Sequence, residues 1–375
     1  LAHDLAGARL HAEKALSFGF NEIAALTLSQ VAARERKFDE AEAHAARVAQ
    51  HGKSQTNRAL AWGVIGDVRD KSGDAAAGFA AFTEGNRILL RLHGGLLREG
   101  HLPYHPDGVG RAASFVERAD VSSWRGPEGE APVFLVGFPR SGTTLLEQVL
   151  SAHSGLVCIE EREHLALSAQ AAAMDPDKLP GLSDDEINAI RAEYWKRVGA
   201  ETKVGIRSVV DKLPLNIIFL PLIRRVFPNA KILFALRDPR DVVLSCYQQR
   251  FGMNAAMVQF LDLQTAAAYY DRVMGLGLLC RERLGLDVLE VRYENVVADL
   301  EGVAREITAF LGIAFEPGML EFQQAARKRN INTPSGRQVV EPIYTRSVAR
   351  WKRYEAQLAP VLPVLNGWAA RLGYS

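Results

Sequence analysis

Residues 131–154 of the chain read APVFLVGFPRSGTTLLEQVLSAHS. An apolar run at 133–136 is followed by a glycine-bounded turn at 137–142, and then by apolar residues at helical spacing. This order predicts a strand, a loop and a helix. The backbone N–H groups of such a loop, together with the free N–H groups at the helix N-terminus, can bind a phosphate or a similar oxyanion.

The loop has the glycine spacing of a nucleoside triphosphate-binding P-loop but lacks the lysine of that motif. Thr143 stands at the lysine position, and Arg140 supplies positive charge inside the loop. We therefore expect a ligand other than a nucleoside triphosphate. The residues expected to contact it are Arg140, Ser141, Gly142, Thr143 and Thr144. The alternative is an ordinary strand-to-helix turn.

The composition permits a globular enzyme and excludes few classes of protein. The chain has 375 residues, of which 48% are hydrophobic, enough for two or three domains. Its formal net charge is +1, so we expect no nucleic-acid partner. No apolar run is long enough to predict a membrane span. The three widely spaced cysteines, Cys158, Cys246 and Cys280, predict reduced buried thiols and a cytoplasmic location.

Ala-rich helical patterns fill the first part of the chain. We expect a helical domain over residues 1–98, a connector without regular structure over 99–130, and an α/β domain over 131–375. Turn-then-helix patterns around Ala41 and Ala76 are 35 residues apart, and a weaker match lies 33 residues before Ala41. These periods predict a tetratricopeptide-type array, whose concave surface would bind a peptide or protein partner. The alternative is that Ala-rich helices resemble one another by composition alone.

Several short apolar runs predict the strands of the α/β domain. Helical segments separate them, which predicts βαβ crossovers and a P-loop-like, mainly parallel sheet flanked by helices. Ligands bind beyond the carboxyl ends of the strands in open sheets of this kind. The expected strands are 133–136, 157–159, 208–211, 232–236 and 288–292.

Polar side chains follow the predicted strands. Arg237, with Ser245 one helical turn into the next predicted helix, would suit a second, separate phosphate, because arginine offers two donors in a fixed fork. Glu160 or Glu161 could act as a general base for an acceptor hydroxyl. Lys212 could stabilise charge that grows on a transferring group. Taken singly, each of these residues could also be an ordinary charged residue on a solvated surface. Asp238, which follows the same strand as Arg237, could instead be a magnesium ligand.

Taken together, these motifs resemble those of sulfotransferases that use 3′-phosphoadenylyl sulfate. The resemblance extends from about Pro132 to Trp351 and is strongest to bacterial tetratricopeptide-repeat sulfotransferases, which are similar to tyrosylprotein sulfotransferases. It rests on PVFLVGFPRSGTTLLEQVLSAHS, the EE pair, DKLP, LFALRDPRDVVLSCY, VRYENV and TPSGRQVVEPIYTRSVARW.

The resemblance implies a role for each matched residue. Loop residues 140–144 would hold the 5′-phosphosulfate, and Arg237 and Ser245 the 3′-phosphate. Glu161 would be the catalytic base, while Lys212 and Arg140 would stabilise the sulfuryl group. The remaining implied contacts of the donor are Tyr293 beside the adenine, Ser335 in a late loop that closes over the nucleotide, and Arg350 where the pattern has a lysine.

The chain departs from the family pattern near the acceptor side. Ile159 precedes the glutamate pair, where tyrosine-modifying members have a small residue. The resemblance therefore does not identify the acceptor of this chain. Gln249 replaces a basic residue, which leaves Arg250 as a substitute. His164 is the rival to Glu161 as base, and His153 is expected to be structural.

We therefore expect a metal-independent sulfotransferase that uses 3′-phosphoadenylyl sulfate. The acceptor would be a hydroxyl group of a peptide, a protein tyrosine or a small molecule. The first alternative is a P-loop kinase, which would need magnesium and a P-loop lysine. The second alternative is a non-catalytic helical-repeat adaptor with a degenerate nucleotide domain.

Overall fold

The computed structural model describes residues 4–122, 124, 129–202, 208–323 and 347–375. The chain forms two compact units that do not follow chain order. The first comprises residues 1–99, 243–267 and 350–367, and the second comprises residues 100–242, 268–349 and 368–375. The domain limits expected at residues 98 and 130 stay predictions.

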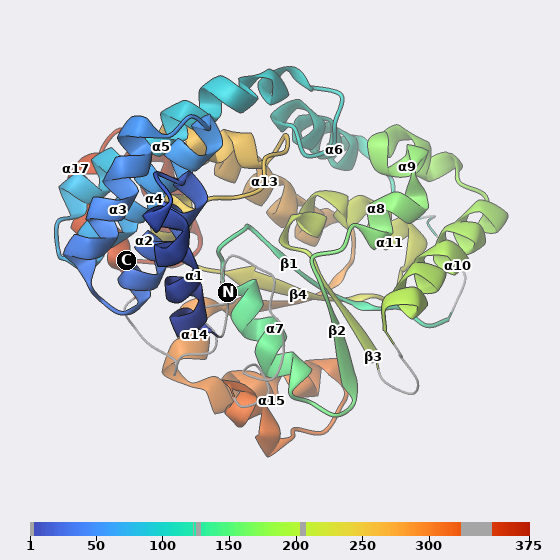
Figure 1. The fold of residues 1–375 in the computed structure, drawn as a ribbon. Coiled ribbons are helices and arrows are strands. Elements are labelled where there is room, and N and C mark those ends of the chain that lie inside the picture. Colours follow the sequence, from blue (N-terminus) through green and yellow to red (C-terminus); the bar gives the residue numbers. More distant parts are fainter. Residues whose placement is uncertain (1–3, 123, 125–128, 203–207, 324–346) are drawn as a thin grey trace. The chain divides into compact units, whose positions relative to one another are not determined.

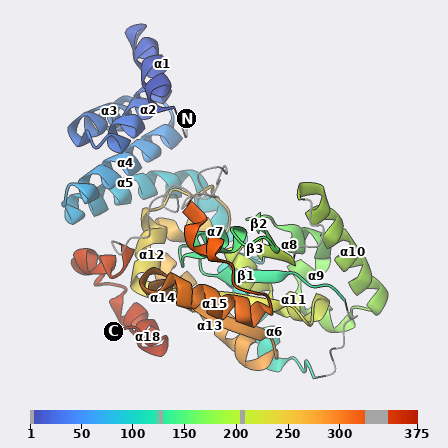
Figure 2. The ribbon, with the colours of Figure 1, turned by 90° about the horizontal axis from the view of Figure 1, so that it is seen from below.

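The N-terminal part of the first unit is helical, as expected. Its consecutive helices pack against one another (Figure 2). Side chains of Asp4, Asn21, Ser54 and Asp74 cap four of the helices by accepting a backbone N–H bond. The helices are α1 (Leu5–Ser17), α2 (Glu22–Arg34), α3 (Phe38–His51), α4 (Gln55–Lys71) and α5 (Ala75–His93), followed by the 3₁₀ helix η1 (Gly94–Arg98).

Small residues allow α4 and α5 to pack closely. A Cβ atom added at Gly66 would lie 2.6 Å from the Phe82 ring, and one added at Gly85 would lie 3.0 Å from the carbonyl oxygen of Ala59. The starts of α1 and α3 are 33 residues apart, as are those of α2 and α4. This spacing is close to that of a two-helix repeat. The tetratricopeptide assignment itself stays a prediction.

The second unit is built on a five-stranded, wholly parallel sheet in the order β2-β3-β1-β4-β5 (Figure 1). In the register, Lys212 lies opposite both Leu135 and Glu160, and Ala235 lies opposite Gly137. The carboxyl ends of all strands therefore meet at one edge. The strands are β1 (Val133–Gly137), β2 (Leu156–Glu160), β3 (Ser208–Lys212), β4 (Lys231–Leu236) and β5 (Asp287–Arg292).

Helices cover both faces of the sheet (Figure 1). On one face, α7 (Thr143–Ser151) and α15 (Leu300–Leu311) pack against the apolar side chains of β1, β3 and β4. On the other face, the rings of Tyr194 and Phe227 lie against Phe134 of β1. The other elements of this unit are α6 (Pro106–Arg118), α8 (His164–Ala169), α9 (Ala171–Met174), η2 (Pro176–Gly181), α10 (Asp184–Glu201), η3 (Pro214–Phe219), α11 (Leu220–Val226), α14 (Tyr293–Ala298) and η5 (Pro317–Glu321).

Some later elements belong wholly to the first unit, and three helices have residues in both. Those of the first unit are η4 (Met257–Leu261), η7 (Arg350–Tyr354) and α17 (Glu355–Leu358). Those with residues in both are α12 (Pro239–Gln248), α13 (Leu263–Arg283) and α18 (Leu362–Arg371).

The expected strands are confirmed, but the connector expected over residues 99–130 was wrongly predicted to lack regular structure. Helix α6 lies within it. Pro106 occupies the first turn of α6, where its missing N–H costs nothing, and His105 accepts a hydrogen bond from the Asp107 N–H at 3.1 Å. Phe115 and Val116 are buried on its inner side.

The three cysteines are reduced thiols, as expected. Cys246 and Cys280 are buried, whereas Cys158 is half-buried. Within the ranges given above, no helix combines the length and apolar character that a membrane crossing requires. The cytoplasmic location stays a prediction.

Candidate active site

The loop between β1 and α7 requires glycine at both of its ends. Gly137 has a φ of 154° and Gly142 a φ of 94°. A Cβ atom at Gly137 would lie 2.6 Å from the Ala235 carbonyl oxygen, and one at Gly142 would lie 2.6 Å from Cδ2 of Tyr293. Arg140, between them, also has a positive φ, 73°. A non-glycine residue in this conformation is strained, and such strain is often found at functional sites.

The N-terminus of α7 offers hydrogen-bond donors to a ligand. Its N-cap residue is Gly142, which has no side chain to accept from the N–H groups of the first turn. The hydroxyl residues Ser141, Thr143 and Thr144 are buried around this point. Loop and helix end thus have the geometry of an oxyanion site.

Arg237 and Tyr293 join this loop from the ends of β4 and β5. The Arg237 guanidinium donates from Nη1 to the Arg140 carbonyl oxygen at 3.1 Å and from Nη2 to the Ser347 carbonyl oxygen at 2.6 Å. Its Cζ lies 4.7 Å from the centroid of the Tyr293 ring. Its Nε is buried and has no hydrogen-bond partner among the described residues. A buried donor of this kind suits an anionic ligand.

Lys212 ends β3 as a fully buried cation between two carboxylates. Its Nζ lies 2.9 Å from Oε2 of Glu147 and 3.0 Å from Oε1 of Glu161. Burial alone would lower the pKa of Lys212, but the negative charges of Glu147 and Glu161 outweigh it, so the pKa is raised. The lysine is therefore held as an ammonium ion.

Glu161 follows β2 in a strained conformation, with a φ of 49°. Its N–H donates to the carbonyl oxygen of Lys212 at 2.8 Å, which ties it to the end of β3. Its side chain is 35% exposed. Glu161 thus contacts the buried ammonium and is also accessible to a molecule arriving from solvent.

Glu147 was not predicted as a site residue from the sequence. This residue lies on α7, and burial raises its pKa to about 6 in spite of the opposing attraction of Lys212. It could have been found, because a carboxylate stands in the apolar stretch LLEQVL of the helix predicted after the loop. A buried charge needs a partner, and that need points to a buried cation nearby.

The rival bases have different surroundings. Glu160 is half-buried and lies opposite Lys212 in the sheet register. His164 is buried, and its Nε2 lies 3.6 Å from Oε2 of Glu201; burial lowers its pKa. His153 has both ring nitrogens engaged, with Nε2 2.8 Å from the Ala314 carbonyl oxygen and Nδ1 accepting from the Gly155 N–H. These contacts support the structural role expected of His153.

Three of the predicted donor contacts lie in the first unit or outside the described residues. Ser245 lies on α12 in the first unit, and Arg350 also belongs to that unit, where its Nη2 lies 2.8 Å from Oδ2 of Asp70. Ser335 lies outside the described residues. Arg250, the substitute for the missing basic residue at Gln249, is paired with Asp67 at 2.5 Å.

The carboxylate that was weighed as a magnesium ligand is paired with an arginine. Asp238, weighed as a magnesium ligand, accepts from both Nε and Nη2 of Arg240, at 2.9 and 2.7 Å. Across the described ranges, no group of three or more His, Cys, Asp or Glu residues could hold a metal ion.

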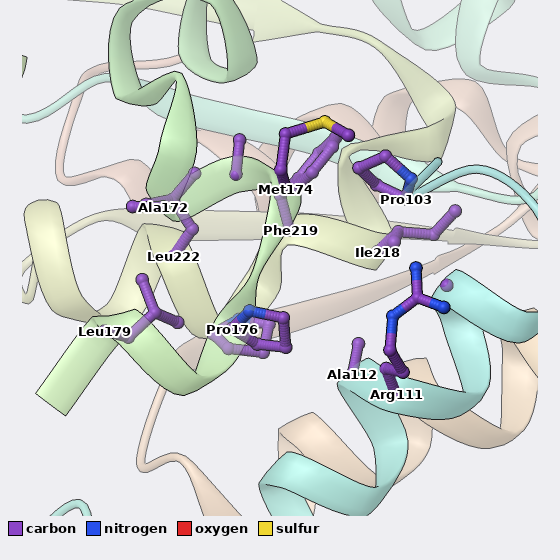
Figure 3. A pocket seen from close by; sticks show the side chains of 13 residues that line it. Pro103, Arg111, Ala112, Ala172, Met174, Pro176, Leu179, Ile218, Phe219 and Leu222 are labelled. Carbon is purple, nitrogen blue, oxygen red and sulfur yellow. The ribbon is translucent and has the colours of Figure 1, made fainter. Parts of the chain in front are cut away.

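Figure 3 shows a pocket that contains none of the predicted site residues. Its lining is mainly apolar, with Met174, Phe219 and Leu222 among the side chains. The one charged lining residue, Arg111, donates to the carbonyl oxygens of Gly100 and His101 at 2.7 and 3.0 Å. The pocket could therefore bind an apolar group, but its lining contains no side chain suited to catalysis.

Asp211, next to Lys212, makes stability depend on pH. It is fully buried, it accepts a hydrogen bond from the Tyr194 hydroxyl at 2.9 Å, and burial raises its pKa from 3.8 to about 7. The folded state thus keeps a proton that the unfolded state loses, so stability should fall as pH rises from about 4 to 7. Asp211→Asn removes this titration. We therefore expect the free energy of unfolding of the variant, taken relative to that of the native protein, to rise by about 2–3 kcal/mol between pH 5 and pH 8.

Urea unfolding of both proteins at the two pH values measures this difference. The native protein should lose stability over the interval and the variant should lose less. A difference between the two proteins that is the same at pH 5 and pH 8 would show that Asp211 does not titrate in this range.

Residues 132–317 match the sequence model of the sulfotransferase family. The chain is 30% identical over 253 residues to an uncharacterized protein of Aquifex aeolicus, covering 64% of this chain and 33% of that protein. It is 26% identical over 257 residues to the protein-tyrosine sulfotransferase of Drosophila melanogaster, covering 62% of this chain and 51% of that protein. It is 26% identical over 260 residues to protein-tyrosine sulfotransferase A of Caenorhabditis elegans, covering 64% of this chain and 67% of that protein.

The matched segment thus spans about one third to two thirds of the length of these relatives. Among solved structures, the sulfotransferase domain from the curacin biosynthetic pathway is similar with a TM-score of 0.48 and 20% identity. That match covers 66% of this chain and 99% of the domain.

Proposed function

We propose that the chain, whose residues 132–317 match the sulfotransferase family model, transfers a sulfuryl group from 3′-phosphoadenylyl sulfate to an acceptor hydroxyl. The observation that supports this most is the contact between Lys212 and Glu161 at the carboxyl edge of the sheet. A cation for the leaving group and a carboxylate for the acceptor proton lie side by side there. The loop at 137–142 follows the neighbouring strand β1.

The residues at this edge suit the donor. The loop and the start of α7 would hold the phosphosulfate through backbone N–H groups and the hydroxyls of Ser141, Thr143 and Thr144. Arg237, whose buried Nε lacks a partner among the described residues, would hold the 3′-phosphate. The family resemblance adds Tyr293, Ser245, Ser335 and Arg350 as further contacts of the donor.

The bound donor supplies a sulfuryl group attached to a phosphate leaving group. Glu161 accepts the hydroxyl proton of the acceptor on its carboxylate as the new bond from the acceptor oxygen to sulfur forms. Lys212 and Arg140 stabilise the negative charge that develops on the phosphate oxygen as its bond to sulfur breaks. The positive charge comes from these side chains, so the proposal requires no metal ion.

The names of the fly and worm relatives make a peptide tyrosine the first acceptor to test. A small-molecule phenol is the second. The helical part of the chain would present a surface to a peptide acceptor if it is a tetratricopeptide array.

Nucleotide preference tests the proposal. We expect adenosine 3′,5′-bisphosphate to raise the melting temperature of the protein, and ATP with magnesium to leave it unchanged, because the loop has no P-loop lysine. Arg237→Gln should reduce the effect of the bisphosphate to that of adenosine 5′-phosphate. Thermal unfolding with each nucleotide measures this preference.

Transfer from labelled donor to a panel of tyrosine peptides and phenols then measures turnover. If ATP with magnesium stabilises the protein and the bisphosphate does not, the result would favour a P-loop kinase and contradict the proposal. If the protein binds the bisphosphate but transfers sulfate to no member of the panel, the result would favour a non-catalytic adaptor.

A further inference from the structure

Glu147 is a buried carboxylate that the proposed mechanism leaves without a role. Its side chain is 5% exposed and lies on α7, the helix that begins at the oxyanion loop. Its Oε2 is 2.9 Å from Nζ of Lys212, about as close as Oε1 of the proposed base Glu161 at 3.0 Å. The helix that would bind the donor therefore also contacts the cation that would act on it.

The groups around Glu147 leave Lys212 as its counter-ion. Lys212 approaches from β3, and Glu160 and Glu161 act from the end of β2 as further negative charges. The Cys158 thiol donates to the backbone carbonyl oxygen of Glu147 at 3.7 Å. Among the described residues, Lys212 is the one cation that forms an ion pair with Glu147. A carboxylate this deeply buried is costly unless such a pair is maintained.

We propose that Glu147 is a positioning residue that holds the Lys212 ammonium in place while Glu161 takes up the acceptor proton. This inference rests on the proposed function. Before transfer, the ammonium is shared between two carboxylates. When Glu161 becomes protonated it loses its charge, and Glu147 remains as the counter-ion of a lysine that is fully buried. The long, flexible side chain of Lys212 thus stays directed at the breaking bond throughout the step.

This role predicts a pH dependence that a purely structural contact would not produce. Protonation of Glu147 removes its charge and releases Lys212. Because burial raises the pKa of Glu147 to about 6, that release should occur well above the usual range of a glutamate. Turnover should therefore decline as pH falls through about 6.

The test compares Glu147→Gln, Glu147→Asp and a control, Glu316→Gln. Gln keeps the shape of Glu147 and an oxygen that can accept from Lys212, but it carries no charge. Glu316 accepts from Ser154 just after α7, with its Oε2 2.8 Å from the Ser154 nitrogen, so its variant makes the same chemical change away from Lys212. Each variant is first checked for folding by circular dichroism and for bisphosphate binding by thermal shift.

We expect Glu147→Gln to lower kcat by about 10- to 100-fold, with little change in KM for the donor, and to remove the decline near pH 6. Glu147→Asp should recover part of kcat and retain an acid limb. Glu316→Gln should behave like the native protein. Glu147→Gln with native kcat and a native pH profile would overturn the inference.

The native protein keeps the inference testable even if Glu147→Gln does not fold. A native kcat that is flat between pH 5 and pH 7 contradicts the role of Glu147 while leaving the sulfotransferase proposal intact. Absence of both turnover and bisphosphate binding in the native protein would instead refute the proposed function, and the inference with it.

Discussion

Glu161→Gln is expected to lower kcat for sulfuryl transfer by about 10²–10⁴-fold, which is the usual contribution of a general base. The amide cannot take the acceptor proton. Its oxygen can still accept from Nζ of Lys212, which lies 3.0 Å from the native carboxylate, so the local structure should persist. Bisphosphate binding should be unchanged, because Glu161 follows β2 and is not part of the loop between β1 and α7. Steady-state kinetics with labelled donor, combined with thermal shift, separate the two effects.

Two neighbours provide the controls for this prediction. Glu160→Gln removes a carboxylate one residue earlier, and His164→Ala removes the imidazole that pairs with Glu201. If Glu161→Gln retains turnover and one of the two controls loses it, the residue changed in that control would be the base. Loss of turnover only in Glu161→Gln identifies Glu161 as the base.

The strands were predictable because each consists of an apolar run next to turn residues. In a parallel sheet the carboxyl ends share one edge, so the residues just after the strands could be grouped from the sequence alone. Arg140, Lys212 and Arg237 follow or end β1, β3 and β4, and the structure places all three at that edge. Strand patterning therefore predicted which residues lie at the edge that forms the candidate site.

The pairing of Lys212 was not predictable in the same way. The sequence shows which residues end a strand but not which helix side chain crosses over to meet them. Glu147 lies 65 residues before Lys212 in the chain, and only the packing of α7 on the sheet brings the two charges together. Helix α6 was missed for a different reason, since its Pro and Gly residues suggested a loop although Pro106 stands at a helix start.

Gly142→Ala is expected to weaken binding of adenosine 3′,5′-bisphosphate by about 10- to 100-fold. The residue has a φ of 94°, a conformation that costs alanine on the order of 1–3 kcal/mol. The new Cβ would also lie 2.6 Å from Cδ2 of Tyr293. The ring cannot yield easily, because the Arg237 guanidinium lies 4.7 Å from its centroid. The loop must therefore shift, and its N–H groups turn away from the ligand.

The control is Gly181→Ala in the same unit, where no atom lies within 4 Å of the added Cβ, and it should bind the bisphosphate like the native protein. Gly142→Ala combined with Tyr293→Ala relieves the contact but not the backbone strain, so it should recover only part of the affinity. Isothermal titration of the four proteins measures these differences. Native affinity in Gly142→Ala would mean that the ligand does not depend on the N–H groups of this loop. The oxyanion site would then have to lie elsewhere, because a phosphosulfate held by α7 cannot tolerate a displaced N-cap.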